Sequence, residues 1–354
     1  MNNQIIDEAK LEVLAGKVVG DIAGAMGVLM AFIGDQAGVY AQLEKAGPIT
    51  SDAFAAKIKM NPLYIREWLS SNAAQGYVNY DPSTERFSLA PEQAIVFARE
   101  GHPACMQGFL QSVLSQFESH EKASQVFQSG EGRPWGDQTS CCFCGTDRFF
   151  RPGYEANLLE SWIPSLGGVE TKLQNGGKIA DIACGHGSSS ILMAKAFPSS
   201  TVHGFDFHEP SIEQARKKAR DAGVDNIEFQ VTSAQEYPGH GYDFACIFDA
   251  LHDMGDPVGA ARHIRKSLSP EGAFMVVEPM AGDTLSENMH PLGAIYYAFS
   301  TTICTPCSLS QEVGLGLGTQ AGQKRLTEVL NEAGFSSVRR ASETPTNMVL
   351  EARI

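Results

Sequence analysis

Two patterns of apolar and polar residues divide this chain. In the amino-terminal part, Leu11–Ile33 carries apolar residues at the three- and four-residue spacing of an amphipathic helix. From about residue 166 onward, short runs rich in β-branched and aromatic residues alternate with helical stretches. The first pattern predicts a helical region, and the second predicts an α/β domain.

The helical region continues through shorter helices and ends in a hairpin. Thr50-Ser51 and Asn61-Pro62 are residues typical of helix starts. The expected elements are the helices Val39–Leu43, Ala53–Ile58 and Leu63–Ser71, followed by the hairpin strands Tyr77–Tyr80 and Arg86–Leu89. Helix, turn, helix and hairpin in this order form a winged-helix pattern.

The remainder combines a helical stretch with a sheet. Residues 92–165 are expected to be mostly helical, with a Gly-rich polar loop over Ser129–Asp147. Expected strands follow at Lys178–Ala183, Thr201–Phe205, Ile227–Val231, Asp243–Ile247, Phe274–Glu278, Ser336–Arg340 and Asn347–Ala352. These seven strands, with an antiparallel closing pair, predict a Rossmann-like sheet.

Charge and composition narrow the partners. With 27 basic and 41 acidic side chains, the net charge is −14. This weighs against nucleic acid and against an anionic membrane surface, because both require positive charge. No stretch is expected to approach the roughly 20 apolar residues that span a bilayer. Met1–Lys10 is polar and acidic, unlike a signal or transit peptide. Eight cysteines without any need for disulfides at this size favour a cytoplasmic chain.

A glycine-rich turn is the most informative local feature. Strand Lys178–Ala183 leads into Cys184-Gly185-His186-Gly187, then a helix, and then a strand that ends at Asp206 followed by Phe207. Gly185 and Gly187 let backbone amides approach a ligand, and Asp206 can bind the two hydroxyls of a ribose. The arrangement predicts a cofactor that contains adenosine.

Two residues distinguish between adenosine cofactors. A dinucleotide turn has a third glycine where this chain has Ser190. Asp181, just before the turn, would repel a pyrophosphate but can accept hydrogen bonds from an ammonium group. The residues therefore favour S-adenosylmethionine (SAM) over NAD. The segment resembles motif I of the class I methyltransferases, with Ala183 in place of the first glycine and His186 in place of a small residue.

Polar residues follow the next two strands at the edge where ligands of such sheets bind. His252 and Asp253 come after Asp243–Ile247, and Glu278 ends the strand after it. A histidine beside an acid can act as a general base with its orienting group. Such a base would activate a hydroxyl or thiol for methylation.

Here the chain resembles the plant-type small-molecule O-methyltransferases. The resemblance implies that His252 of the His252-Asp253 pair is the base and that Glu278 orients it. The family's second orienting acid has no match within Thr319–Leu326, and Met254 replaces the usual tryptophan. The family also has an amino-terminal winged-helix-like domain that forms a homodimer.

Over nearly its whole length the chain is similar to bacterial and invertebrate winged-helix methyltransferases. Residues 149–154, 251–259 and 304–313 carry this similarity. It implies that Arg151 and Tyr154 close over the methionine end of the cofactor. Ser233 and Ala234 are expected near the adenine, and Asp249 near the cofactor through its backbone.

Two other interpretations remain open. The rival interpretation is a SAM-sensing transcriptional regulator whose winged helix binds DNA. Against it, Leu63–Ser71 carries only Arg66 as a cation, next to Glu67. Cys141, Cys142 and Cys144 with Cys304 and Cys307 have a spacing that suits zinc poorly, so no metal site is expected. A soft acceptor at these thiols is a minority hypothesis.

We therefore predict a methyltransferase that converts SAM to S-adenosylhomocysteine and methylates an oxygen or sulfur of a small molecule. The expected domains are 1–95, winged-helix-like and dimerising; 96–165, a helical connector or lid; and 166–354, the SAM-binding catalytic domain.

Overall fold

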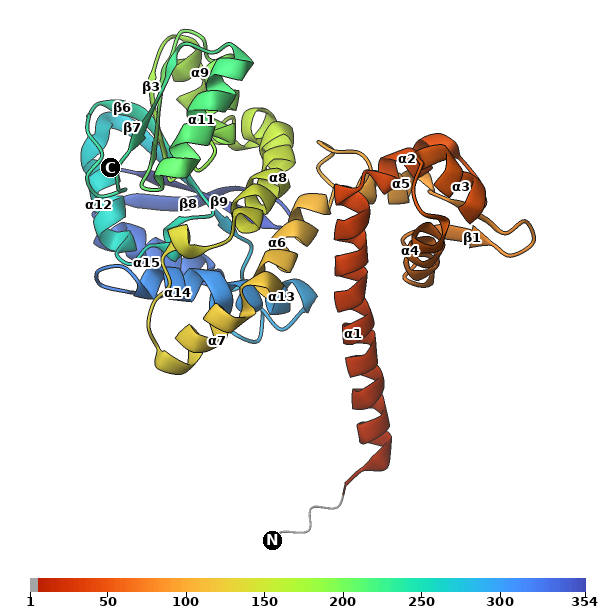
Figure 1. Ribbon diagram of the computed structural model, residues 1–354. Coiled ribbons are helices and arrows are strands. Elements are labelled where there is room, and N and C mark those ends of the chain that lie inside the picture. The colour runs from red at the N-terminus through yellow and green to blue at the C-terminus, as the bar shows by residue number, and fades with distance from the viewer. Residues whose placement is uncertain (1–5) are drawn as a thin grey trace. The chain divides into compact units, whose positions relative to one another are not determined.

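The computed structural model describes residues 6–354, and these form two compact units (Figure 1). One unit runs to Glu118 and also takes in Ser140–Pro152, whereas the other consists of Ser119–Thr139 and Gly153–Ile354. The segment that we expected as a connector, 96–165, is shared between the two units.

The first unit has the predicted winged-helix order. It contains α1 (Glu8–Gln36), α2 (Val39–Ala46), α3 (Ser51–Ile58), α4 (Pro62–Ala74), β1 (Asn79–Asp81), β2 (Arg86–Ser88), α5 (Pro91–Phe97), α6 (Gln107–Glu118) and the first part of α8 (Ser140–Asn157). The expected caps are present: Thr50 Oγ1 accepts from Ala53 N at 3.5 Å, and Asn61 Oδ1 accepts from Leu63 N at 2.9 Å.

The core of this unit forms around aromatic residues. Tyr40 packs edge-on against Trp68 with ring centroids 4.9 Å apart. Trp68 also lies across α1, because a Cβ at Gly34 would come within 2.2 Å of its ring. Its indole N–H donates to Met30 O at 2.8 Å. The carboxyl-terminal part of α1 is thus fixed to α4 through one glycine.

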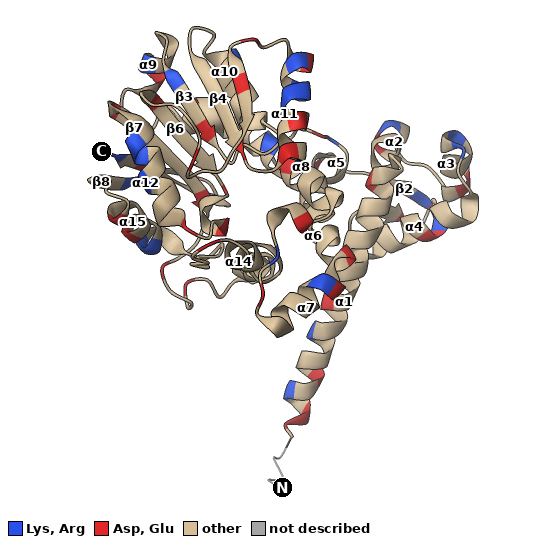
Figure 2. Cartoon of the chain, turned by 60° about the vertical axis from the view of Figure 1, so that its left-hand side comes forward, with Lys and Arg blue, Asp and Glu red and all other residues tan. Residues whose placement is uncertain are grey.

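The amino-terminal part of α1 corrects one expectation. By length and composition α1 can cross a membrane, yet only 6% of its most apolar window is buried in the structure. Of the described residues, 6–354, no other helix passes this test. The sequence analysis was wrong to exclude such a stretch. Lys17 and Asp21 interrupt the apolar letters, but they pair with each other at 2.6 Å across one helical turn. Figure 2 shows both acidic and basic residues along α1.

The start of α8 is a second correction. We expected a loop over Ser129–Asp147, but α8 begins at Ser140. Close packing against α6 explains the helix. A Cβ at Gly145 would lie 2.7 Å from Ser112 Oγ, and one at Gly108 would lie 2.4 Å from Phe149 N. Glycine and polar residues indicated a loop locally, but Gly108 and Gly145 let the two helices approach each other.

The second unit is built on the seven-stranded sheet in the order β5-β4-β3-β6-β7-β9-β8. The strands are β3 (Lys178–Ile182), β4 (Thr201–Asp206), β5 (Ile227–Val231), β6 (Tyr242–Phe248), β7 (Leu268–Pro279), β8 (Ser337–Glu343) and β9 (Asn347–Arg353). The first five are parallel, and β9 pairs antiparallel with both β7 and β8. The Rossmann-like seven-stranded prediction is confirmed.

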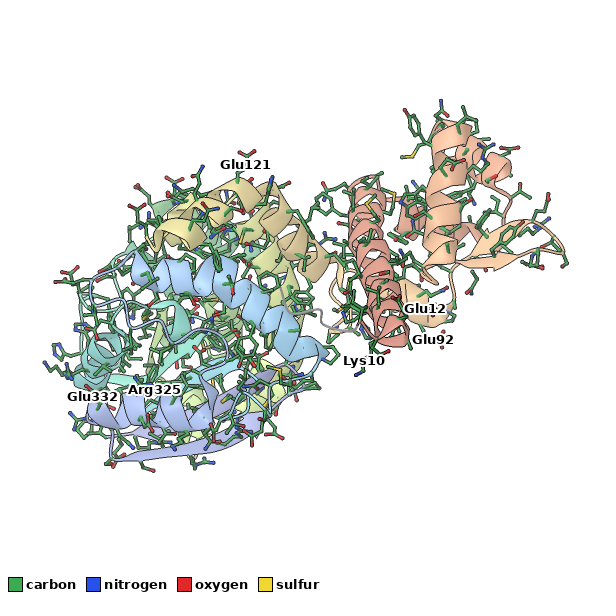
Figure 3. The ribbon with its side chains drawn as sticks, turned by 90° about the horizontal axis from the view of Figure 1, so that it is seen from below. Lys10, Glu12, Glu92, Glu121, Arg325 and Glu332 are labelled. Carbon is green, nitrogen blue, oxygen red and sulfur yellow. The ribbon has the colours of Figure 1, made fainter. Side chains whose placement is uncertain are left out.

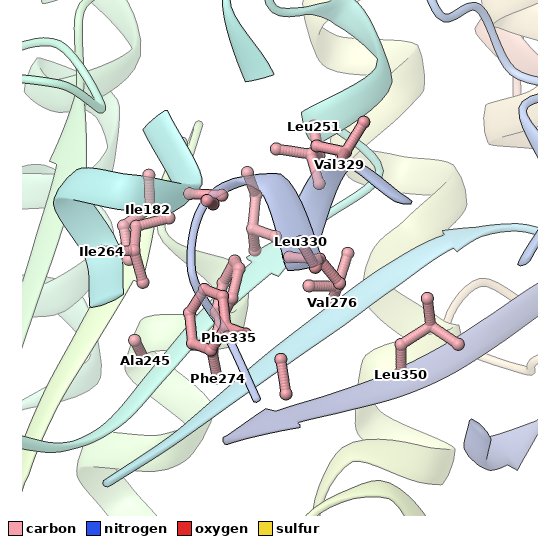
Figure 4. Close-up of a cluster of buried hydrophobic side chains, with 14 of the residues drawn as sticks. Ile182, Ala245, Leu251, Ile264, Phe274, Val276, Val329, Leu330, Phe335 and Leu350 are labelled. Carbon is pink, nitrogen blue, oxygen red and sulfur yellow. The ribbon is translucent and has the colours of Figure 1, made fainter. Parts of the chain in front are cut away.

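Helices cover both faces of this sheet. Ala180 and Ile182 point to the face packed by α12 (Pro257–Ser267) and α15 (Gly322–Glu332), as the cluster in Figure 4 shows. Ile179 points to the other face, toward α9 (Val169–Gln174), α10 (Ser188–Ala196) and the π-helix η2 (Leu158–Trp162). Alternation along β3 thus fills two cores. Helix α15 turns its charged side chains, including the labelled Arg325 and Glu332, away from this core (Figure 3).

The remaining elements of the second unit connect or cover the strands. They are α7 (His120–Ser129), η1 (Trp135–Asp137), α11 (Glu209–Ala222), η3 (Leu251–Asp253), α13 (Pro291–Phe299), the π-helix η4 (Ser300–Cys304) and α14 (Thr305–Leu309). The segment before η1 is attached to α14, since Arg133 N donates to Pro306 O at 2.8 Å. A Cβ at Gly132 would come within 2.1 Å of Ser310 N.

Candidate active site

The turn after β3 has the backbone that its glycines predict. Gly187 has φ +74°, and a Cβ there would lie 2.7 Å from Phe229 Cζ. Gly185 has φ +52° with open space where a Cβ would stand. Ala183 also adopts a left-handed φ, +56°, at the position of the missing motif glycine. The turn therefore keeps its shape at the cost of strain at one alanine.

Asp206 lies beside this turn at the end of β4. Its Oδ2 accepts from Gly185 N at 2.9 Å, and its Oδ1 accepts from His208 N at 2.8 Å. An ionised carboxylate has about four acceptor positions, so capacity remains for two hydroxyl groups. Burial raises the pKa of Asp206, while the two backbone N–H groups oppose the shift. Phe207 next to it is 51% exposed, so its ring is open to a ligand.

Asp181 lies deeper than expected, with no exposed surface. Its Oδ2 accepts from Ser189 Oγ at 2.7 Å and Ser190 Oγ at 2.5 Å, and Cys246 Sγ lies 3.7 Å from Oδ1. Burial raises the pKa of Asp181 to about 6, although the serine hydroxyls oppose this. Ser190 occupies the position where a dinucleotide turn has its third glycine, and together with Ser189 it binds the carboxylate.

His252 and Glu278 meet at the ends of β6 and β7. These strands are parallel neighbours, so residues that follow them lie at one edge of the sheet. His252 Nδ1 lies 2.5 Å from Glu278 Oε2, and Glu278 Oε1 accepts from Leu251 N at 2.9 Å. Both side chains are buried. Glu278 therefore holds the imidazole through Nδ1.

The second nitrogen faces Asp253. His252 Nε2 lies 3.2 Å from Asp253 Oδ1. Burial opposes the charged form of the imidazole, but the carboxylates of Glu278 and Asp253 outweigh it and raise the pKa of His252 well above its usual range. The predicted trio thus forms one connected group. Gly318 N donates to His252 O at 3.3 Å, which places the segment without the family's second acid against this group.

Asp249 lies beside the same group, held by a residue that the sequence analysis missed. Asn347 Nδ2 donates to Asp249 Oδ1 at 2.7 Å. Asp249 Oδ2 is buried with no hydrogen-bond partner. Burial, with the nearby charge of Glu278, raises the pKa of Asp249 well above its usual range. Asn347 begins the last strand and is distant in sequence, so only its polarity ahead of an apolar run could have drawn attention to it.

The residues predicted near the adenine and those predicted near the methionine part of the cofactor lie in different surroundings. Ser233 Oγ donates to Glu236 Oε2 at 3.2 Å, and Ala234 packs against the core. Both follow Thr232, whose N–H donates to Asp206 O at 2.9 Å, so they stay beside the ribose candidate. The ring of Tyr154 packs at a tilt against that of Phe248, the residue before Asp249, with centroids 4.9 Å apart. Arg151 belongs to the other unit, where it pairs with Glu100 at 3.3 Å.

Comparison with known proteins identifies both parts of the chain. Residues 173–334 match a methyltransferase domain family, and residues 24–99 match the Rv2258c-like winged HTH domain. The chain therefore carries a methyltransferase domain. The winged-helix prediction and the class I resemblance are therefore confirmed.

Relatives support the same class. The demethylmenaquinone methyltransferase of Listeria monocytogenes is 27% identical over 184 residues, which is 49% of this chain and 76% of that protein. That of Staphylococcus aureus is 27% identical over 180 residues, 49% of this chain and 73% of that protein. Both alignments cover about half of this chain.

Solved structures share the fold over almost the whole chain. A putative O-methyltransferase from Nostoc punctiforme has a TM-score of 0.73 at 18% identity, over 96% of this chain and 98% of that one. Human N-acetylserotonin methyltransferase in complex with SAM has a TM-score of 0.72 at 15% identity, over 100% and 99%. These identities show the fold alone.

The methyltransferase domain has groups that fit SAM. The Asp206 carboxylate has spare acceptor capacity beside the glycine turn, next to the exposed Phe207. Asp249 Oδ2 is a buried acceptor without a donor, which an ammonium or hydroxyl group of a ligand would satisfy. Asp181 Oδ2 already accepts two hydrogen bonds, from Ser189 and Ser190. Asp181 would therefore influence a ligand indirectly, by holding the glycine turn in place.

Proposed function

We propose that the protein transfers a methyl group from SAM to an oxygen or sulfur atom of a small molecule, with His252 as general base. The observation that carries this proposal is the buried His252–Glu278 contact of 2.5 Å, at the same sheet edge as the glycine turn and Asp206. Bound SAM supplies an electrophilic methyl group, which an anionic acceptor can attack.

The proton path follows from the hydrogen bonds of His252. In the neutral imidazole, Nδ1–H donates to Glu278 and Nε2 carries the lone pair that would take the proton of an acceptor O–H or S–H. Because the pKa of His252 is raised, this neutral form becomes populated only at a pH above the usual range of histidine. The imidazolium that forms is stabilised by Glu278 on one side and Asp253 on the other. A base of this kind contributes about 10²- to 10⁴-fold to the rate.

The cofactor residues have separate roles. Asp206 would accept the ribose hydroxyls, Gly185 and Gly187 shape the turn, and Phe207, Ser233 and Ala234 would contact the adenine. Asp249 would accept a donor of the methionine part. Tyr154, which packs against Phe248, would line the methionine end of the cofactor. Arg151 would have to break its ion pair with Glu100 to contact the cofactor.

Cofactor binding is tested by calorimetry with SAM and S-adenosylhomocysteine. Asp206→Ala and the milder Asp206→Asn should weaken both ligands at least about tenfold, the loss of one charged hydrogen bond. The matched control is Glu209→Ala, an exposed acid three residues further on, which should bind as the wild type does. Absence of binding to the wild type would refute the proposal.

Catalysis is tested with isotope-labelled SAM and a panel of phenols, thiols and carboxylic acids. His252→Ala should lower turnover by about 10²-fold or more while cofactor affinity changes little. Unchanged turnover would exclude His252 as the base. A panel that separates phenols from thiols also decides between oxygen and sulfur as the acceptor atom.

A homodimer through α1 is the second part of the proposal. Exposed apolar side chains run along this helix at Leu11, Leu14, Val18, Ile22 and Met26. Open space surrounds the Cβ positions of Gly16, Gly20 and Gly24, so a second helix can approach the backbone closely. Glu8, Glu12, Asp21 and Asp35 outnumber Lys10 and Lys17, which disfavours an anionic membrane as the occupant.

Light scattering of the purified protein tests this assembly. The wild type should be a dimer at micromolar concentration, and Val18→Glu with Ile22→Glu should give a folded monomer. Leu285→Glu changes an equally exposed leucine of the second unit and should remain dimeric. A monomeric wild type would refute α1 as a dimer element.

The transcriptional-regulator alternative is not favoured. The helix that would enter DNA, α4, has Arg66 as its one cation, and this guanidinium pairs with Glu67 at 2.9 Å. A phosphate contact would have to replace that pair.

A further inference from the structure

Three side chains of different chemistry converge beside the base. The ligand atoms of His252, Asp253 and Cys304 all lie within 4.8 Å of one another. His252 and Asp253 come from η3, and Cys304 ends the π-helix η4. Single π-helical turns are found frequently at functional sites. Sequence spacing could not suggest this group, because about fifty residues separate its two parts.

The imidazole is oriented as in metal sites. A metal-bound histidine almost always gives its other N–H to a carboxylate or carbonyl, which fixes the ring and its tautomer. His252 has this partner, since Nδ1 lies 2.5 Å from the buried Glu278 Oε2. The lone pair of Nε2 is therefore directed toward Asp253 and Cys304.

The distances and donor types suit a small tetrahedral cation. Two N or O ligands of tetrahedral zinc stand about 3.4 Å apart, as follows from bond lengths of about 2.0–2.2 Å. Nε2 and Asp253 Oδ1 are 3.2 Å apart. One nitrogen, one carboxylate oxygen and one thiolate form a zinc-like donor set, and three protein ligands leave the fourth position open.

The negative charge around His252 also favours a bound cation. Asp249, Asp253 and Glu278 surround one imidazole in a largely buried region. The Asp253 side chain as a whole keeps 19% exposure, which gives an ion a route from solvent.

We propose that His252, Asp253 and Cys304 bind a divalent transition-metal ion of the zinc class. Binding displaces two protons to solvent, that of the Cys304 thiol and that on His252 Nε2, and the ion takes the lone pairs that they leave. An ion here therefore blocks the proton acceptor and inhibits methyl transfer, and this consequence alone rests on the proposed function. The sequence analysis expected no metal, because it considered only cysteine spacing.

Cobalt(II) titration of the apoprotein tests the site without any methyl acceptor. We expect a sulfur-to-cobalt charge-transfer band in the near ultraviolet, and zinc should displace it. Cys304→Ser should abolish the band. Asp253→Asn keeps the thiolate, so it should retain the band while weakening cobalt at least about tenfold. The matched control is Cys246→Ser, which changes a fully buried thiol outside the group and should retain the band.

The outcomes separate the two proposals. Circular dichroism and SAM calorimetry on Cys304→Ser establish that the variant is folded and still binds its cofactor. A band that persists in Cys304→Ser arises from other thiols and overturns the site, as does a wild type without any band. SAM binding by a protein that fails to bind cobalt would leave the proposed function standing. In the wild type, zinc should leave SAM affinity unchanged, and a chelator should restore any methyl transfer that zinc suppresses.

Discussion

The buried carboxyl of Asp181 gives a prediction whose size follows from the structure. Its pKa is raised from 3.8 to about 6 by burial. One pKa unit corresponds to about 1.36 kcal/mol, so a shift of about 2.2 units is worth roughly 3 kcal/mol. The folded state binds the proton more tightly than the unfolded chain does. This contribution is therefore fully present below about pH 4 and is lost as the pH rises through about 6.

Asp181→Asn removes the titration while keeping the shape of the side chain. We expect the free energy of unfolding of the wild type, measured relative to this variant, to fall by up to about 3 kcal/mol between pH 4 and pH 7. Urea unfolding at several pH values measures the difference, and subtracting the variant cancels the titration of other groups.

A second variant checks the cause of the shift. Ser190→Ala removes the 2.5 Å hydrogen bond that favours the ionised carboxyl. The pKa of Asp181 should then rise further, and the loss of stability should extend to higher pH. If wild type and Asp181→Asn change in parallel across this range, burial of Asp181 does not control its ionisation and the reasoning is wrong.

Three further predictions concern the turn and the base. Ala183→Gly should stabilise the fold by about 0.5–1 kcal/mol, because it relieves a residue at φ +56°, and thermal unfolding measures the gain. Gly187→Ala should cost about 2 kcal/mol or more in urea unfolding, since its Cβ would meet Phe229 at 2.7 Å; a neutral effect would mean that the ring moves freely. Glu278→Gln should lower turnover by at least about tenfold with unchanged SAM affinity, because the amide stabilises the imidazolium less than the carboxylate does; equal turnover would remove Glu278 as the orienting group.

The sequence predicted those strands and helix starts that depend on neighbouring residues. Strand β5 was expected at Ile227–Val231 and begins and ends there, and Thr50 and Asn61 cap the helices that follow them. The neighbouring ends of β6 and β7 also brought His252 and Glu278 together as expected, because parallel strands present their carboxyl ends at one edge.

What the sequence could not supply depends on packing between distant segments. The residues 140–147 have a loop-like composition, yet Gly108 and Gly145 let α6 and α8 pack closely enough to make them helical. Cys304 and Asn347 reach the site from elements that follow His252 by dozens of residues. Asp181 was assigned to a ligand, but Ser189 and Ser190 are close enough to occupy its Oδ2 first.

The way in which the chain passes between its two units has a practical consequence. It leaves the first unit after Glu118, returns at Ser140, and leaves again inside a continuous helix at Pro152. A single truncation cannot therefore release an intact catalytic fragment. A fragment that starts near residue 166 would lose Gly132 and Arg133, which pack against α14 and the residue after it. Truncation, fusion or exchange of one half between homologues would have to preserve both interleaved stretches.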